Sequence, residues 1–327
     1  MAQFLVIGDA TVDQMYFIDK LPEVGGEVSA THAVMEPGGA GGTIATALAR
    51  LEHDVTIATR VGTGPFSALA LKHLRKTGVD MSLVQSDPYL QTSSVTILIT
   101  PDGQRTMIGA AGASRDLDAR ALRPEHVERR DALVMSAYSL ISGPQRTYSL
   151  RALQLAKDAG VRVFVDMGTG AVNALQEGLM PLLEGVEVVL MNERELFTLT
   201  GESSISDAVS GLRARGIDQV VVKVGEMGSI VVTPERSELV EAYAIDGVLD
   251  TTGAGDVYTA AFVAAVVEGH DLLQAAWLAN VAGALTTREI GAQRITIDRA
   301  TLLQQAGLAG GAISAAGGVA TRTTARR

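Results

Sequence analysis

Residues 250–256 of this 327-residue chain read DTTGAGD, and an almost uncharged stretch of helical character follows at once. Two glycines separated by one alanine let backbone N–H groups turn toward one point, and the positive end of the helix dipole that begins there favours an anion. Asp256 stands at the edge of this anion site, where a carboxylate could take a proton from a hydroxyl that attacks a phosphate. The local sequence leaves a second interpretation open, in which Asp256 caps the helix and the glycines form a tight turn.

Short apolar runs, several of them rich in valine, alternate with helical patterns along the chain. Such runs are typical of parallel strands buried on both faces. The expected strands are Phe4–Gly8, Val55–Thr59, Ala132–Ser136, Val161–Asp166, Val186–Met191 and Gln219–Val224, and the expected helices cover residues 41–52, 65–77, 144–159, 193–200, 204–215, 255–268 and 271–288. The alternation predicts an α/β fold with a doubly wound, mostly parallel sheet flanked by helices. Ligands of such sheets bind beyond the carboxyl ends of the strands, and Asp166, Asn192 and Lys223 all stand at such ends.

Two segments interrupt this alternation. Residues 14–36 contain an apolar cluster followed by partly alternating polarity, and residues 92–113 contain Asp102-Gly103, a strong hairpin turn. These segments predict strands of a small separate sheet. An edge extension of the main sheet is the alternative.

Composition excludes several classes of protein. The net charge of −10 argues against nucleic acid or an anionic membrane as the main partner, and the absence of cysteine excludes disulfides and thiolate chemistry. The N-terminus lacks the basic region of a signal peptide, so we expect a cytoplasmic protein. Residues 1–305 read as one domain, whereas the residues from Ala306 to 327 are rich in glycine, alanine and threonine and are expected to be disordered.

Several motifs follow one another in a recognisable order. They are GDATVD at 8–13, GGAGGT at 38–43, NERE at 192–195, KVGEMG at 223–228, the DTTGAGD stretch, and Ala279-Asn280 with Gly291-Ala292. In this order the chain resembles the ribokinase family of carbohydrate kinases, also called the PfkB family, over nearly all of residues 3–300. The resemblance implies a ribokinase-like fold in which the small sheet is a lid over the sugar.

The resemblance also implies an activity and a set of site residues. We expect an ATP-dependent sugar kinase that transfers the γ-phosphate of ATP to a sugar hydroxyl, with Asp256 as general base and an anion hole at Gly253, Ala254 and Gly255. The residues expected at the sugar are Asp13, Gly38, Gly39, Gly41, Gly42 and Thr43, and those expected at ATP are Asn192, Lys223, Gly225, Gly228 and Asn280. For Asp13 an Asx-turn, and for Lys223 a solvated lysine at a strand end, are the structural alternatives.

Asn192 and Glu195 are candidates for contact with a magnesium ion. They are three residues apart, so they share a helix face, and both present oxygen atoms to a hard cation or to its water shell. The same spacing is that of a capping box, in which Asn192 caps the helix and Glu195 completes the box. Both arrangements can hold at once, and contact through water is favoured over direct ligation by Glu195.

A potassium ion is a further implication of the resemblance. Many family members hold this ion through carbonyl oxygens near the anion loop. The corresponding residues here are Asp250, Thr252, Thr287 and Gly291.

The chain departs from the usual family pattern at two places. Thr43 stands where asparagine is common, which puts ribose itself in doubt, and the segment after Asp166 lacks an arginine that several family members carry. An acidic or phosphorylated sugar would require such a cation. Arg105 or Arg115 could supply it, although we expect both side chains to face solvent.

Three functions are compatible with the sequence, and one quaternary arrangement is expected. A sugar kinase is the leading interpretation. A nucleoside kinase of the same fold would need an apolar base pocket under the lid, formed for example by Met15, Phe17, Met107 and Ile108. A non-catalytic sugar-binding regulator is disfavoured, because the candidate base and anion loop are intact. The apolar lid segments predict a homodimer joined through the lids.

Overall fold

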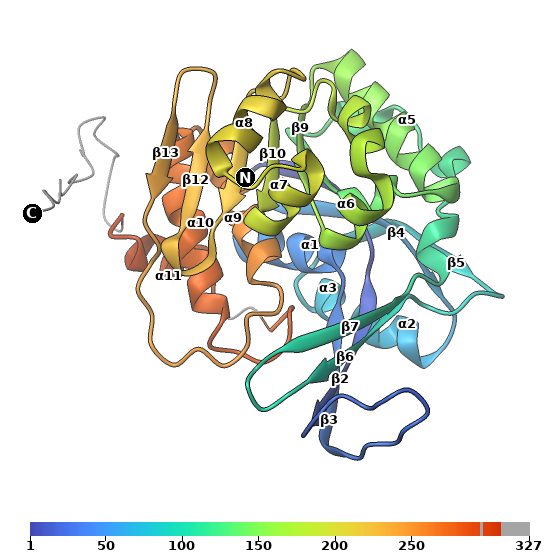
Figure 1. The fold of residues 1–327 in the computed structure, drawn as a ribbon. Helices are drawn as coiled ribbons and strands as arrows, with labels where there is room; N and C mark the ends of the chain where they lie inside the picture. The colour runs from blue at the N-terminus through green and yellow to red at the C-terminus, as the bar shows by residue number, and fades with distance from the viewer. Residues whose placement is uncertain (295–296, 309–327) are drawn as a thin grey trace, which may run out of the picture.

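The computed structural model describes residues 1–294 and 297–308 and contains two β-sheets (Figure 1). The large sheet has nine strands in the order β13-β12-β11-β10-β9-β8-β1-β4-β5. Seven of them pair in parallel, and the last two form an antiparallel edge. The parallel strands are β1 (Gln3–Ile7), β4 (Asp54–Gly62), β5 (Asp80–Asp87), β8 (Ala132–Ser136), β9 (Arg162–Asp166), β10 (Val188–Asn192) and β11 (Val220–Lys223), and the edge strands are β12 (Ser229–Val232) and β13 (Ser237–Val240).

Helices cover both faces of the large sheet, because successive strand residues point to opposite sides. In β1, Phe4 and Val6 pack into one hydrophobic cluster and Leu5 and Ile7 into the other. The first cluster lies under α1 (Ala40–Arg50), α3 (Lys72–Lys76), α9 (Ala254–Val267), α10 (Leu272–Thr286) and α11 (Arg299–Gln305), and the second under α4 (Glu125–Glu128), α5 (Gly143–Ala159), α6 (Thr169–Leu175), α7 (Glu193–Thr200) and α8 (Ile205–Arg213). The architecture is therefore doubly wound.

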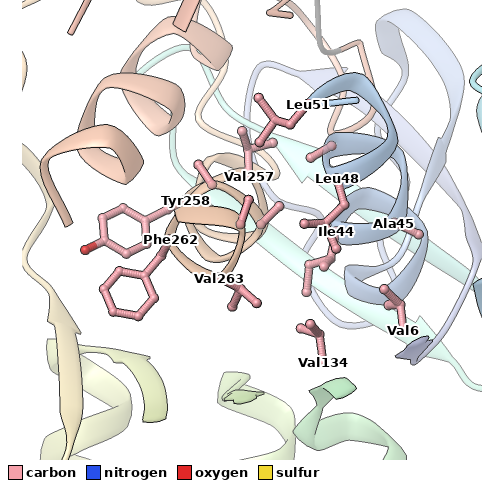
Figure 2. Packing of buried hydrophobic residues seen from close by; sticks show 14 of the residues in the cluster. Val6, Ile44, Ala45, Leu48, Leu51, Val134, Val257, Tyr258, Phe262 and Val263 are labelled. Carbon is pink, nitrogen blue, oxygen red and sulfur yellow. The ribbon is translucent and has the colours of Figure 1, made fainter. Parts of the chain in front are cut away.

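The helix after the anion loop is held firmly in the core. All residues from Val257 to Val266 of α9 are buried. Figure 2 shows α9 beside α1, with Val257 next to Leu51, Ile44 facing α9, and Val263 directed toward the side where Val134 of the sheet lies. Burying such side chains is worth about 1.5–3 kcal/mol each, so the start of α9 is fixed relative to the strand ends.

Four strands form the small sheet, in the order β3-β2-β6-β7, at one end of the molecule (Figure 1). They are β2 (Thr11–Ile18), β3 (Ala30–Gly38), β6 (Ser94–Ile99) and β7 (Arg105–Ala110). Met15 and Ile97, which are opposite each other in β2 and β6, are buried on one face, and Val12 on the other face packs into the first hydrophobic cluster. We call this small sheet the lid.

The predicted fold class is confirmed, and so is a lid separate from the main sheet, whereas several elements were not predicted. β5, β12 and β13 were missed, and the single helix expected at 65–77 is two short ones, α2 (Pro65–Ala70) and α3. Of the tail expected to be disordered, residues 309–327 lie outside the described part of the chain. Among the described residues no helix is both long and apolar enough to cross a membrane.

Candidate active site

The anion loop and α9 meet at Gly253, which is the N-cap of the helix. Its φ of 78° lies in the left-handed region, and a Cβ there would come within 2.7 Å of the Ala292 backbone, so only glycine fits. The Ala254 N–H donates to the Thr251 carbonyl at 3.3 Å. In the described part of the chain, no backbone acceptor is found for the N–H groups of Gly253 and Gly255. These two groups remain available to an anion.

Asp256 is the third residue of α9 and lies among other charged groups. Burial and the negative charge of Asp166 raise its pKa to about 7, against the lowering effect of Lys223, and Asp13 and Glu195 raise it further. The pKa of Asp13 also rises, to about 6, mainly through burial. Three predicted site residues, Asp13, Glu195 and Lys223, therefore lie within electrostatic reach of Asp256. A carboxylate with a pKa near neutrality suits a general base.

Lys223 reaches from the end of β11 toward α9. Its Nζ donates to Asp166 Oδ1 at 2.7 Å and lies 3.4 Å from the Gly255 carbonyl oxygen. Burial lowers the pKa of Lys223, but the charges of Asp166 and Glu195 outweigh this effect and the pKa is raised. Thr259 also donates to Asp166 Oδ1, at 2.6 Å. Lys223 is therefore a charged, partnered group under the anion loop, not the solvated lysine of the structural alternative.

The predicted sugar-side residues come together at the base of the lid. Asp13, only 5% exposed, accepts a hydrogen bond from Thr11 Oγ1 at 2.9 Å. A Cβ at Gly38 would lie 2.2 Å from the Asp13 carboxyl group, so the glycine makes room for this side chain.

The other glycines of this motif have packing reasons of their own. A Cβ would meet the backbone of Asp9 at Gly39, the backbone of Gly8 at Gly41, and the side chain of Gln293 at Gly42. Thr43 is fully buried, and its hydroxyl has no partner among the described residues.

The capping box expected at Asn192 and Glu195 is present. The Asn192 side chain accepts from the Glu195 N–H at 2.8 Å, and Glu195 Oε2 accepts from the Asn192 N–H at 3.0 Å. Thr169 Oγ1 donates to the other carboxylate oxygen at 3.1 Å, and burial raises the pKa of Glu195 although Lys223 opposes this. Each carboxylate oxygen keeps a free lone pair, which fits the water shell of Mg²⁺ better than a direct bond.

The residues predicted at the nucleotide end are spread over three elements. Gly225 lies after β11 with open space around its Cα, whereas Gly228 packs against the backbone of Val240. Asn280 is 8% exposed, and its amide group donates to the carbonyls of Val240 and Glu241, both at 3.0 Å. Asn280 thus fixes the end of β13, and its direct contact with ATP stays a prediction.

The expectation that Arg105 faces solvent is wrong. Its side chain is 20% exposed and pairs with Asp250 Oδ1 at 2.9 Å, because the β6–β7 hairpin carries it onto the anion loop. Arg115, by contrast, is exposed and lines a cavity of about 290 Å³ between the lid and α5. Asp9, Tyr138 and Gln145 also line this cavity.

The sequence analysis did not predict this cavity. The available signal was the position of Asp9, two residues after the carboxyl end of β1, because ligands of such sheets bind beyond these ends. Asp9 accepts from Gln145 Nε2 at 2.6 Å, and burial raises its pKa. The residues that a nucleoside kinase would need for a base pocket, Met15, Phe17, Met107 and Ile108, differ in burial, and Phe17 is half-buried. Met15 lies in the core, whereas Met107 and Ile108 are 54% and 61% exposed.

The crowded carboxylates lead to a prediction about stability. A carboxyl group whose pKa is raised by folding costs stability once pH rises from its unfolded value, near 4, through its folded value, about 7. Asparagine avoids this cost, so Asp256→Asn should gain about 1–2 kcal/mol of unfolding free energy at pH 8. At pH 4 the gain should vanish. Urea unfolding at both pH values measures it.

A matched control is Asp207→Asn, since Asp207 holds the same third position in α8 and caps with Ser204. We expect no gain in that variant at either pH. An equal gain in unfolding free energy in both variants would show that the gain does not come from the charged groups around Asp256.

Comparisons with known proteins identify the family of the chain. Residues 1–299 match the model of the pfkB family carbohydrate kinases. The chain is 31% identical to an ATP-dependent ribose-1-phosphate kinase of Halopiger xanaduensis, over 90% of this chain and 94% of the relative.

Solved structures give the same result. The structure of Arabidopsis thaliana ribokinase with ribose and ATP matches with a TM-score of 0.80 at 27% identity, covering 93% of this chain and 98% of the other. An adenosine kinase from Sinorhizobium meliloti matches with a TM-score of 0.83, covering 93% and 99%, and at 23% identity it shows the fold alone.

Proposed function

The chain belongs to the pfkB family of carbohydrate kinases and is an ATP-dependent carbohydrate kinase, and from this premise we propose that Asp256 is its general base and Asp13 its sugar anchor. The observation that carries the proposal is the position of Asp256 at the start of α9, beside free N–H groups and within reach of Asp13. A carboxylate and an anion site side by side are what phosphoryl transfer to a hydroxyl requires.

The residues have different roles at the sugar end and at the phosphate end of the proposed site. Asp13 accepts hydroxyl groups of the sugar and so fixes the acceptor hydroxyl near Asp256. Asp256 takes the proton of that hydroxyl as its oxygen attacks the γ-phosphorus of ATP, while the bond to the leaving ADP oxygen breaks. The N–H groups of Gly253 and Gly255 stabilise the charge on the phosphate during transfer.

Lys223, Glu195 and Asn192 support the nucleotide end. The ammonium group of Lys223 lowers the pKa of Asp256, so part of Asp256 stays ionised at neutral pH. Glu195 would hold Mg²⁺ through water. When bound, Mg²⁺ neutralises phosphate oxygens.

The acceptor is a sugar, and the cavity at Arg115 leaves room for a substituent on it. The cavity borders Thr11, the hydrogen-bond partner of Asp13, so a group carried by the bound sugar would extend into it. A phosphate would meet Arg115, and a nucleobase would meet Tyr138 and Ile141. A nucleoside is therefore the second candidate beside a phosphorylated sugar.

A phosphorylation screen distinguishes these acceptors. ADP formation is measured with ATP and Mg²⁺ across ribose, fructose, ribose 1-phosphate, adenosine and inosine. Arg115→Gln should raise the KM for a phosphorylated sugar about tenfold, because the phosphate loses its cationic partner. The KM for a nucleoside should stay unchanged. No turnover of any sugar or nucleoside would contradict the proposed function.

Assembly and location complete the proposal. Residues 1–305 act as one kinase domain with lid segments near 14–36 and 92–113, in the cytoplasm, where ATP is available. Exposed apolar side chains on the lid's edge strands, Met35, Met107 and Ile108, support a homodimer joined through the lids.

Mass measurement by light scattering tests the dimer. We expect the mass of two chains at micromolar concentration, and Ile108→Glu should halve it by placing a charge in the interface. Leu239→Glu is the control, because Leu239 is 56% exposed and lies on β13, an edge strand of the large sheet and not part of the lid. A single-chain mass for the unmodified protein would refute the lid dimer.

A further inference from the structure

Arg105 joins the lid to the anion loop through two hydrogen bonds. Its Nη2 lies 2.9 Å from Asp250 Oδ1, and its Nη1 donates to Thr252 Oγ1 at 2.9 Å. Thr252 donates in turn to Asp250 Oδ1, at 2.6 Å from its hydroxyl and 2.9 Å from its N–H. The side chains of Arg105 and Asp250 are 20% and 8% exposed, so this is a shielded ion pair.

Two further polar groups around Asp250, its second carboxylate oxygen and the Thr287 carbonyl, are also occupied. Asp250 Oδ2 accepts from the Gly291 N–H at 2.9 Å. The Thr287 carbonyl accepts from the N–H groups of Leu249 and Asp250, at 2.8 and 3.1 Å, which uses both of its lone pairs.

These contacts do not fit the potassium site that the family resemblance implies at Asp250, Thr252, Thr287 and Gly291. The residues do lie together, but the Asp250 charge is already neutralised by a guanidinium, Gly291 directs an N–H toward the carboxylate, and the Thr287 carbonyl is saturated. A cation there would lie against the positive charge of Arg105, and like charges in a shielded site repel strongly.

We propose that the Arg105 guanidinium takes the place of a monovalent cation at Asp250, so that the lid itself supplies the charge that orders the anion loop. Arg105 is then a positioning residue, because it acts on the loop through Asp250 and Thr252. The inference rests on the proposed role of residues 250–256 as the anion loop.

The position of Asp250 explains why its neutralisation matters for the sugar. The negative charge of Asp250 raises the pKa of the nearby Asp13, so the two carboxylates repel each other. Removing the Arg105 charge would strengthen this repulsion and loosen both the loop and the sugar anchor. The expected loss therefore appears in the KM for the sugar as well as in kcat.

The first test needs no variant. Activity and thermal unfolding are compared in KCl and in tetramethylammonium chloride, both at about 100 mM so that screening is equal. We expect kcat/KM to agree within about twofold and unfolding midpoints within about 1 °C. A large, specific stimulation or stabilisation of the unmodified protein by K⁺ would overturn the proposal.

The second test creates the missing site. Arg105→Gln should lower kcat/KM for the sugar by about 10–100-fold in tetramethylammonium, and K⁺ should restore at least about fivefold and raise the unfolding midpoint by about 2–4 °C. Arg105→Lys keeps the charge and should stay insensitive to K⁺. If kcat/KM of Arg105→Gln is lowered equally in both salts, Arg105 only attaches the lid to the anion loop. That result would overturn the proposal that its charge replaces a monovalent cation.

Arg294→Gln is the matched control. Arg294 lies in the same loop as Gly291 and pairs with Glu36 of the lid strand β3, so it also ties the lid to that loop, but without touching Asp250. We expect no K⁺ response in this variant. The unfolding midpoints are measured without substrate, so they do not depend on the proposed kinase chemistry. A failure of that chemistry can therefore be distinguished from a failure of the charge replacement.

Discussion

Replacing Asp256 by asparagine should lower kcat by about 10²–10⁴-fold, the usual cost of losing a general base. Asparagine keeps the size of the side chain and its place in the first turn of α9, but it accepts no proton. The binding of ATP should change little, because the N–H groups of Gly253 and Gly255 do not depend on this side chain. Steady-state kinetics and ATP titration together measure both effects.

Asp207→Asn is again the control for the kinetic experiment. It removes a carboxylate from the same position of α8, and we expect normal turnover. Near-normal turnover of Asp256→Asn would rule out Asp256 as the base. A fall in ATP affinity as large as the fall in kcat would mean instead that Asp256 serves mainly to organise the anion loop.

The second large effect concerns the sugar. Asp13→Ala removes a buried, charged acceptor, and hydrogen bonds to charged groups are worth about 1.5–3 kcal/mol each. If Asp13 holds two sugar hydroxyls, the KM for the sugar should rise about 100-fold or more. The Kd for ATP should stay within about twofold, because Asp13 lies at the lid end of the cleft. Isothermal titration with each ligand separates the two.

Asp19→Ala is a suitable control, since Asp19 is exposed just after β2 in the same lid segment. Its sugar and ATP affinities should both match those of the unmodified protein. Loss of ATP affinity with unchanged sugar affinity in Asp13→Ala would reverse the proposed orientation of the cleft.

The sequence predicted those elements whose physics is local. β1, β8 and β9 are apolar on both faces, so an apolar run sufficed to find them. β13 alternates between exposed and half-buried residues over four positions and includes Glu238, and a run that short has no clear period. The break in the expected helix 65–77 is equally local but subtle: Leu71 is at once the C-cap of α2 and the N-cap of α3.

The candidate site shows the same division. The capping box of Asn192 and Glu195 depends on residues three apart and could be predicted. Arg105 and Thr252 are 147 residues apart, and Lys223 and Asp166 are 57 apart, so these contacts exist only after the sheet and the lid have formed. The need for glycine at position 38, where the Asp13 carboxyl group lies against the backbone, arises in the same way.

The pH dependence of kcat/KM for ATP, measured at saturating sugar so that Asp13 is already engaged, tests the central claim most directly. The base must be ionised to act, and the pKa of Asp256 is about 7. The rate of the unmodified enzyme should therefore fall about tenfold per pH unit below that value and level off above it. The account predicts that this ionisation disappears from the residual activity of Asp256→Asn. The same ionisation persisting in that variant would contradict the assignment of Asp256 as the base.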